Sequence, residues 1–234
     1  MGLRRKRNDK LTVKNRLIAL MQPKSPISEQ YRTIRTNIQF SAVDSDLCTI
    51  TVSSAGPGEG KTTTISNLAV VFAQQGKRVL LVDCDLRKPM IHNVFQKPNT
   101  LGLTNVLTKQ IDAAKAIHET AMENLFVMTS GPIPPNPAEL LGSASMEAFI
   151  KEVTAHFDLV LFDTPPVLAV ADAQIMANQT DASILVVSSG NTDRDGAMKA
   201  KETLASAKGR LLGAVLNNKE LENGADYYYY YSYK

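Results

Sequence analysis

The residues of this 234-residue chain that are best suited to chemistry lie in one glycine-rich segment, Ser54–Thr63. Within it, Ala55–Thr62 has the spacing of a phosphate-binding loop: one small residue, four others and then Gly-Lys-Thr. Glycines let backbone N–H groups turn towards phosphate oxygens, and the N-terminus of the following helix adds partial positive charge. Lys61 would neutralise the β- and γ-phosphates, and the Thr62 hydroxyl would hold Mg²⁺. The one departure from the strict pattern is Ala55, which stands in place of glycine.

A glycine-rich stretch between a strand and a helix can also be only a tight turn. Here an apolar run, Leu47–Val52, precedes the loop and a helical pattern follows it over 61–75, which favours phosphate binding. The residues expected to surround the phosphates are Gly56, Gly58, Glu59, Gly60, Lys61, Thr62 and Thr63.

Three aspartates follow two further apolar runs. Asp83 and Asp85 come after Val79–Val82, and Asp163 comes after Leu159–Phe162. Ligands of an open α/β sheet bind beyond the carboxyl ends of the strands, so we expect these acids near the phosphate loop. A single aspartate at a strand end could equally cap a turn or a helix. The three acids and the loop together predict a Mg²⁺–ATP site.

The fold class follows from the order of the apolar runs, which alternate with helical stretches. The runs lack the alternation of a half-buried strand, as is typical of strands covered on both faces. We therefore predict an α/β fold with a mostly parallel sheet and helices on both faces. The predicted strands are 47–52, 79–82, 125–128, 159–162, 183–187 and 212–216, and the predicted helices are 28–40, 61–75, 111–120, 145–156, 172–179 and 194–207.

Composition and charge suggest three parts: a basic flexible N-terminal arm over 1–24, a phosphate-loop domain over 25–217 and a flexible tyrosine-rich tail over 218–234. The arm is either a solvated extension or a contact for an anionic membrane or acidic partner, and no motif supports nucleic acid. No apolar run approaches the roughly 20 residues of a membrane span. The two cysteines form no CxxC pair, which favours a reduced cytosolic compartment.

The tail has an unusual composition. Tyrosines are normally used in cores, yet six of the seven in this chain follow a polar stretch near its end, which suggests a chemical use. They are Tyr227, Tyr228, Tyr229, Tyr230, Tyr231 and Tyr233.

Together these features resemble the bacterial tyrosine kinases, which belong to the ParA/MinD-type phosphate-loop ATPases. The phosphate loop, Val79–Pro89 and Leu159–Pro166 look like the family's Walker A, A′ and B motifs. Glu29-x-x-Arg32-x-x-Arg35 is similar to its subunit-contact motif, and the tail resembles its autophosphorylation tail. The resemblance covers roughly 25–234 and implies a non-specific protein-tyrosine kinase that uses ATP and Mg²⁺.

The resemblance also implies roles for single residues. Lys61, Asp83, Asp85 and Asp163 would be catalytic, with Thr62, Asp85 and Asp163 holding Mg²⁺. Asp83 would orient or deprotonate the acceptor tyrosine, or act mainly on the metal. Asn217 would contact adenine, although an ordinary loop residue is an equal alternative.

The same resemblance implies partners. Glu29, Arg32 and Arg35 would join subunits in a homo-oligomeric ring whose tails are phosphorylated in trans, or would form an ordinary salt-bridged surface. Some family members carry two transmembrane helices and an outer domain, which are absent here. We therefore expect the split, Gram-positive form, which lies at the inner face of the cell membrane through the cytoplasmic tail of a separate membrane-protein activator. It would phosphorylate protein tyrosines, and a phosphatase would reverse this phosphorylation. It would regulate the synthesis or export of extracellular or capsular polysaccharide.

Two other classes compete with a kinase. A ParA/MinD-like ATPase switch would carry a signature lysine where this chain has Gly56, and the tyrosine tail has no purpose in such a switch. A scaffold that uses nucleotide only to set its oligomeric state is the second alternative. An iron–sulfur carrier of the same group would need the missing CxxC pair.

Overall fold

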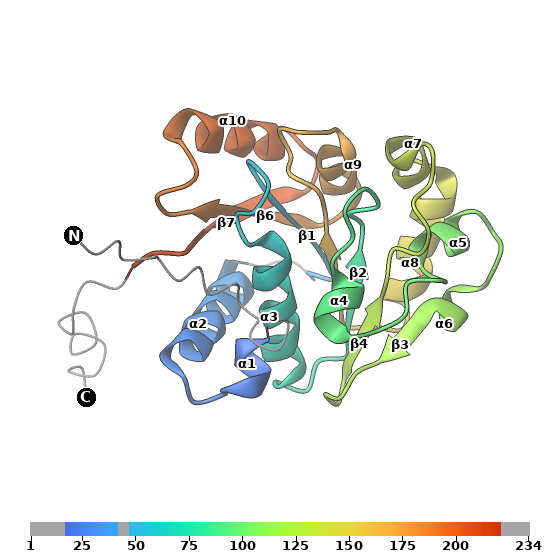
Figure 1. Cartoon of the computed structure of the whole chain (residues 1–234), viewed down its shortest axis with the longest axis horizontal. Helices are drawn as coiled ribbons and strands as arrows, with labels where there is room; N and C mark the ends of the chain where they lie inside the picture. The colour runs from blue at the N-terminus through green and yellow to red at the C-terminus, as the bar shows by residue number, and fades with distance from the viewer. Residues whose placement is uncertain (1–16, 42–46, 221–234) are drawn as a thin grey trace, which may run out of the picture.

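The computed structural model describes residues 17–41 and 47–220, which form a seven-stranded sheet in the order β3-β4-β2-β5-β1-β6-β7 (Figure 1). All neighbouring strands are parallel except β3, which runs antiparallel to β4. The predicted fold class is therefore confirmed. The strands are β1 (Thr49–Ser54), β2 (Val79–Asp83), β3 (Ile117–Glu119), β4 (Leu125–Met128), β5 (Leu159–Asp163), β6 (Ala182–Ser188) and β7 (Arg210–Asn217).

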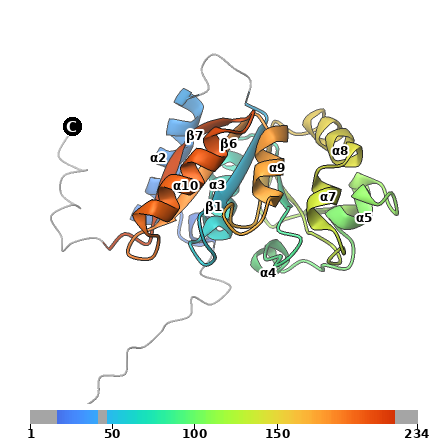
Figure 2. The same cartoon turned by 90° about the horizontal axis from the view of Figure 1, so that it is seen from above.

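Helices cover both faces of the sheet, with α2 behind β6 and β7 and α10 in front of them in the view from above (Figure 2). Val79 and Leu81 of β2 face a cluster with α1, α2 and α3, whereas Leu80 and Val82 face a cluster with α5 and α8. Both faces of the strand are thus buried, which explains its unbroken apolar sequence. The helices are α1 (Ile18–Met21), α2 (Pro26–Ser41), α3 (Lys61–Ala73), α4 (Ile91–Phe95), α5 (Leu103–Leu107), α6 (Ala113–Ala116), α7 (Pro137–Leu141), α8 (Ala144–Thr154), α9 (Asp172–Gln179) and α10 (Arg194–Ala205).

Helix α3, which follows the phosphate loop, lies in the interior. Every residue from Thr64 to Ala73 is buried, because the sheet covers one side of the helix and α1 and α2 cover the other. The second half of the helix, 68–73, is wholly apolar, as is typical of a helix covered on all sides. The loop that precedes α3 is therefore attached to one of the least accessible elements of the molecule.

The predicted helix over 111–120 is wrong in its second half. Residues Ala113–Ala116 form α6, but Ile117–Glu119 form β3 at the edge of the sheet. Tertiary pairing with β4 overrides the local helical preference here. The short helices α4, α5 and α7 were also not predicted.

The predicted flexible arm over 1–24 needs a correction from residue 17 onwards, while residues 1–16 lie outside the described part of the chain. The amide of Ala19, in α1, donates to Asn67 Oδ1 at 2.9 Å, and Gln74 Nε2 donates to the Ala19 carbonyl at 3.2 Å. The Ser28 hydroxyl donates to the Gln22 carbonyl at 2.7 Å. These contacts hold α1 and the turn after it against α3 and α2.

Replacing Asn67 tests this docking. In Asn67→Ala the buried amide of Ala19 loses its acceptor, and we expect the free energy of unfolding to fall by about 1–3 kcal/mol. Urea denaturation followed by circular dichroism measures the change. The control Asn37→Ala, at an exposed position of α2, should stay within about 0.5 kcal/mol of the parent. Equal losses in the two variants would contradict the docking of α1.

Candidate active site

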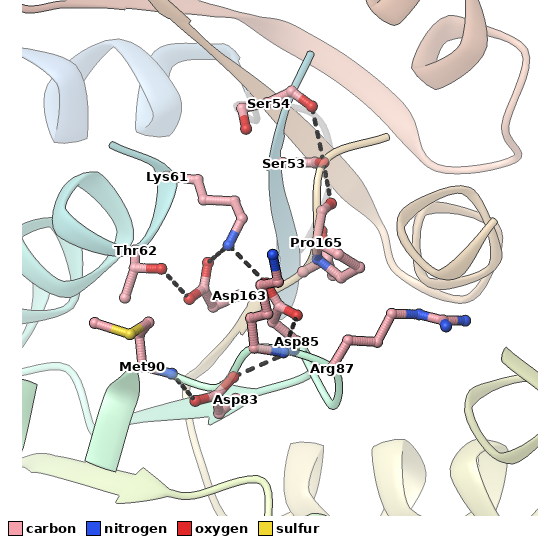
Figure 3. A network of polar contacts seen from close by, with 12 residues as sticks. Ser53, Ser54, Lys61, Thr62, Asp83, Asp85, Arg87, Met90, Asp163 and Pro165 are labelled. Atoms are coloured by element: carbon pink, nitrogen blue, oxygen red, sulfur yellow. Dashed lines mark hydrogen bonds and ion pairs between the residues drawn. The ribbon is translucent and has the colours of Figure 1, made fainter. Parts of the chain in front are cut away.

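The strand order brings the predicted site together. β5 lies between β1 and β2, so the ends of three strands that carry predicted site residues are adjacent. Asp83 pairs in register with Asp163, and Val52, just before the phosphate loop, pairs with Asp163 on the other side. Figure 3 shows the resulting cluster, in which side chains from β2, β5 and the first turn of α3 point towards one another. The convergence expected at the carboxyl edge of the sheet is present.

The phosphate loop is braced from inside and from β7. Glu59 is buried, and its Oε2 accepts the amide N–H of Ala55 at 3.0 Å. The side-chain amide of Asn217, the last residue of β7, donates to the Glu59 carbonyl at 2.9 Å. Ala55 lies in an apolar cluster with Val167. The methyl group of Ala55, at the position where the strict pattern has glycine, therefore fills a small apolar space.

Two glycines of the loop have backbone conformations that favour glycine. Gly58 has φ +78° and Gly60 has φ +94°. A Cβ on Gly60 would also lie 2.0 Å from Asn217 Nδ2, which is closer than any real contact. The predicted role of Asn217 at adenine stays a prediction, since in this structure its amide packs against the loop.

Lys61 and Thr62, at the start of α3, contact two of the three aspartates. Lys61 Nζ donates to Asp85 Oδ2 at 3.0 Å and lies 3.9 Å from Asp163 Oδ1. The Thr62 hydroxyl donates to Asp163 Oδ2 at 2.6 Å. Thr63, next along the helix, is half-buried, and its carbonyl accepts a hydrogen bond from Asn67 Nδ2 at 2.8 Å. The two predicted Mg²⁺ carboxylates thus lie around one ammonium group.

Burial of several carboxyl groups close together shifts their pKa values. Burial, helped by the neighbouring Asp163, raises the pKa of Asp83 to about 8. Burial also raises the pKa of Asp163, although the Lys61 ammonium and the Thr62 hydroxyl oppose it. For Lys61, burial lowers the pKa, but Asp163, Asp85 and Asp83 together outweigh burial and raise it above its usual range. The cluster carries more negative than positive groups and would gain from a further cation.

Asp83 contacts its own loop more than any open space. Its side chain is wholly buried; Oδ1 accepts the Asp85 amide at 3.2 Å, and Oδ2 accepts the amides of Met90 and Ile91, each at 2.9 Å. These are the amides at the N-terminus of α4. In this conformation Asp83 therefore fixes the course of the loop 84–90 that carries Asp85.

The donor set fits Mg²⁺. Asp163 Oδ1 is buried without a hydrogen-bond partner, and carboxylate and hydroxyl oxygens are the ligands that Mg²⁺ prefers. Within the part of the chain that the structure describes, no group of three or more His, Cys, Asp or Glu could hold a metal ion by itself. Asp85, Asp163 and Thr62 would therefore share the ion with phosphate oxygens and water, as is usual for Mg²⁺ with nucleotides.

The predicted subunit-contact residues lie away from this cluster and do not act alike. Arg32 forms an ion pair with Glu29 on the exposed side of α2. Arg35 instead turns inwards and donates from Nη1 to the Val71 carbonyl in the last turn of α3 at 2.6 Å. The predicted phosphorylation sites, 227–231 and Tyr233, lie outside the described residues.

An ion pair between Arg87 and Asp172 was not predicted. Asp172 is wholly buried, and the two residues are 85 positions apart. A buried acid at the start of a helix looks like an ordinary helix-terminal residue in the sequence, so no pattern could have paired it with Arg87.

Comparison with known proteins finds relatives that extend over most of this chain. A family model described as an AAA domain matches residues 47–216. The tyrosine-protein kinase YwqD of Bacillus subtilis is 54% identical over 230 residues, covering 98% of this chain and 96% of that protein. Among solved structures, the chimerical protein CapA2B2 matches with a TM-score of 0.86 and 43% identity over 88% of this chain and 91% of that one. The septum site-determining protein MinD of Pyrococcus horikoshii, solved with Mg-ADP, matches with a TM-score of 0.64 and 25% identity over 77% of this chain and 75% of that one.

The packing of the loop against Asn217 can be tested with a pair of glycines. Gly60 and Gly76 both have positive φ, at +94° and +89°, but only a Cβ at Gly60 meets another group. Alanine at either position should cost about 1–2 kcal/mol of stability, since both conformations are left-handed. Gly60→Ala should in addition weaken binding of a fluorescent ATP analogue at least about tenfold, or about 1.4 kcal/mol, and Gly76→Ala should leave binding unchanged. Equal binding by the two variants would show that the loop does not depend on this contact.

Proposed function

Because the chain belongs to the bacterial tyrosine-protein kinases, a family of phosphate-loop ATPases, we propose that it transfers the γ-phosphate of ATP to tyrosines of its own C-terminal segment. The observation that carries this proposal is the contact of Lys61 and Thr62 with Asp85 and Asp163 at the N-terminus of α3. The relatives named tyrosine-protein kinase extend over nearly the whole chain, which supports the same activity.

The phosphate end of ATP would bind at the loop 55–62. The amides around Gly58 and Gly60 and the N-terminus of α3 supply hydrogen bonds and partial positive charge to phosphate oxygens. Lys61 would move its ammonium from Asp85 towards the β- and γ-phosphates. Mg²⁺, held by Asp85, Asp163 and Thr62, would neutralise the charge on the transferring phosphoryl group.

The acceptor phenol needs help to lose its proton. With a pKa of about 10, ionising a tyrosine at neutral pH costs about 4 kcal/mol. Asp83 is the candidate base, but both of its carboxylate oxygens accept backbone hydrogen bonds and it has no exposed surface. We therefore propose that Asp83 acts mainly on the metal site, by holding the loop that carries Asp85, and does not itself take the proton of the tyrosine.

The tail supports phosphorylation between subunits. Asn218–Lys234 is 17 residues long and would reach up to about 55–60 Å when extended, enough to enter a neighbouring site. Each phosphate would add about −1.5 to −2 charges, so several on one tail would repel one another and alter docking. The exposed Glu29–Arg32 pair on α2 is the proposed contact between neighbours in a ring.

The proposed partner is a membrane protein. Within residues 17–41 and 47–220, no helix is long and apolar enough to cross a membrane. We propose that the cytoplasmic tail of a separate membrane protein activates the kinase at the inner face of the cell membrane, and that a phosphatase reverses its action. In this setting the kinase would regulate the synthesis or export of extracellular or capsular polysaccharide. The likeness to split family members supports this role.

A MinD-like ATPase switch is an alternative because MinD shares this fold, although its TM-score of 0.64 is lower than the 0.86 of CapA2B2. A switch of that kind would carry its signature lysine at position 56, where this chain has glycine. A nucleotide-dependent scaffold without kinase activity is the remaining alternative. These three functions predict different fates for the γ-phosphate of ATP.

Incubation with γ-labelled ATP and Mg²⁺ separates the three. We expect label on tyrosine, reduced at least about 10²-fold in Lys61→Met because the charge on the transferred group is no longer neutralised. The control Lys151→Met, at an exposed position of α8, should label normally. A variant with all six tail tyrosines changed to Phe should bind nucleotide and lose the label. Phosphate release without protein label would support the switch, and neither signal would support the scaffold.

The proposed ring contact can be tested on α2. Arg32→Ala should shift the sedimentation of the unphosphorylated protein towards the monomer, because it removes an exposed charge without touching α3. Arg35→Ala should mainly lower stability, because the Val71 carbonyl loses its donor. The control Arg194→Ala, at an exposed position at the start of α10, should sediment like the parent. Identical sedimentation of Arg32→Ala and the parent would contradict the contact.

A further inference from the structure

The ion pair between Arg87 and Asp172 has the geometry of a rigid connection. Arg87 Nε donates to Asp172 Oδ2 at 2.9 Å, and Nη2 donates to Asp172 Oδ1 at 3.1 Å. Two parallel hydrogen bonds of this kind fix both the distance and the orientation of the two groups. The Asp172 side chain has no exposed surface, whereas that of Arg87 is 40% exposed.

The Arg87 side chain points away from the phosphate-binding groups. In Figure 3 it extends in the direction opposite to Lys61 and Thr62, so its guanidinium does not face the loop 55–62. Arg87 in this conformation is therefore not a candidate for direct contact with the transferred phosphoryl group. Its contact is with the first residue of α9.

The pair joins the two segments that carry the proposed Mg²⁺ carboxylates. Asp85 lies two residues before Arg87, and Asp163 begins the segment that ends at Asp172. The first half of that segment is attached to β1, where Ser53 Oγ donates to the Pro165 carbonyl at 2.7 Å. Its far end, Asp172, is held by Arg87. The loop 84–90 and the segment 164–171 are thus linked across the ends of β2 and β5.

We propose that Arg87 is a positioning residue for the metal: by binding Asp172 it holds the loop 84–90 so that Asp85 stays at the distance from Asp163 that a shared Mg²⁺ requires. This inference rests on the proposed nucleotide site and adds to it a residue that touches neither nucleotide nor metal. Residues that orient metal ligands typically change metal affinity by about 10- to 100-fold when replaced.

The proposal separates metal affinity from nucleotide affinity. The phosphate loop is braced by Glu59 and Asn217, not by Arg87, so binding without metal should not depend on the pair. A purely structural role would instead weaken binding with and without metal alike, together with stability. The dependence of binding on Mg²⁺ is therefore the informative measurement.

The test uses a fluorescent ADP analogue with the full chain, first in chelator and then during titration with Mg²⁺. Arg87→Gln and Asp172→Asn should each raise, about tenfold or more, the Mg²⁺ concentration that gives half of the Mg²⁺-dependent change in analogue binding. The affinity for the analogue in chelator should stay unchanged. The double variant Arg87→Gln, Asp172→Asn leaves no unpaired charge, and its effect should equal that of either single variant because both remove one interaction. Arg87→Lys, which keeps the charge but loses the second hydrogen bond, should lie in between. Lys88→Gln makes the same charge change at the next, exposed position and should behave as the parent.

The outcomes are distinct. The positioning role would be overturned if binding of the analogue by the double variant depended on Mg²⁺ as in the parent. It would also be overturned if the double variant lost as much affinity for the analogue in chelator as it lost with Mg²⁺. Either result would leave the nucleotide site intact. Failure of the parent chain itself to bind the analogue would overturn the proposed function, and this inference with it. A circular-dichroism melting curve of each variant shows that the compared proteins are folded.

Discussion

The structure depends most on one electrostatic constraint: one half-buried ammonium, that of Lys61, lies beside the buried carboxyl groups of Asp85 and Asp163, and a third buried carboxyl group, that of Asp83, lies next to them. Asp83, Asp85 and Asp163 lie at the ends of adjacent strands, and water does not screen them from one another. Burial with too few cations raises the pKa of Asp83 and Asp163. Such an arrangement is unfavourable for the fold and favourable for binding a divalent cation with an anionic nucleotide. Perturbed carboxylates of this kind are typical of functional sites.

The sequence was sufficient for the parts of the fold that are set by local pattern. Strands buried on both faces have unbroken apolar runs, and six of the seven were predicted at nearly their observed positions. The seventh, β3, has three residues and depends on its pairing with β4, which no local pattern contains. Helix α1 was missed for a similar reason, since its backbone is held by Asn67 of α3 and by Gln74, the residue after α3, about 50 residues away.

The same distinction applies to the site. Lys61, Thr62, Asp85 and Asp163 were predicted together because the phosphate loop and strand-end acids have fixed places in this fold. Spacing could not show that Asp83 is enclosed by the amides of its own loop, or that Arg35 donates a hydrogen bond to a carbonyl of α3. The Arg87–Asp172 pair joins residues far apart in the chain, so it became apparent only from the folded structure.

Helix α3 explains why this sparse set of groups suffices. Phosphoryl transfer needs positioning and charge neutralisation more than covalent chemistry, so the scaffold must not yield when ligands bind. At its N-terminus α3 follows a loop braced by Asn217, and near its C-terminus the Val71 carbonyl is held by Arg35 of α2. From Thr64 to Ala73 every residue of the helix is buried against the sheet or against α1 and α2. Lys61 and Thr62 are therefore attached to a rigid helix, and the loop that carries Asp85 is held by Asp83 and by the Arg87–Asp172 pair.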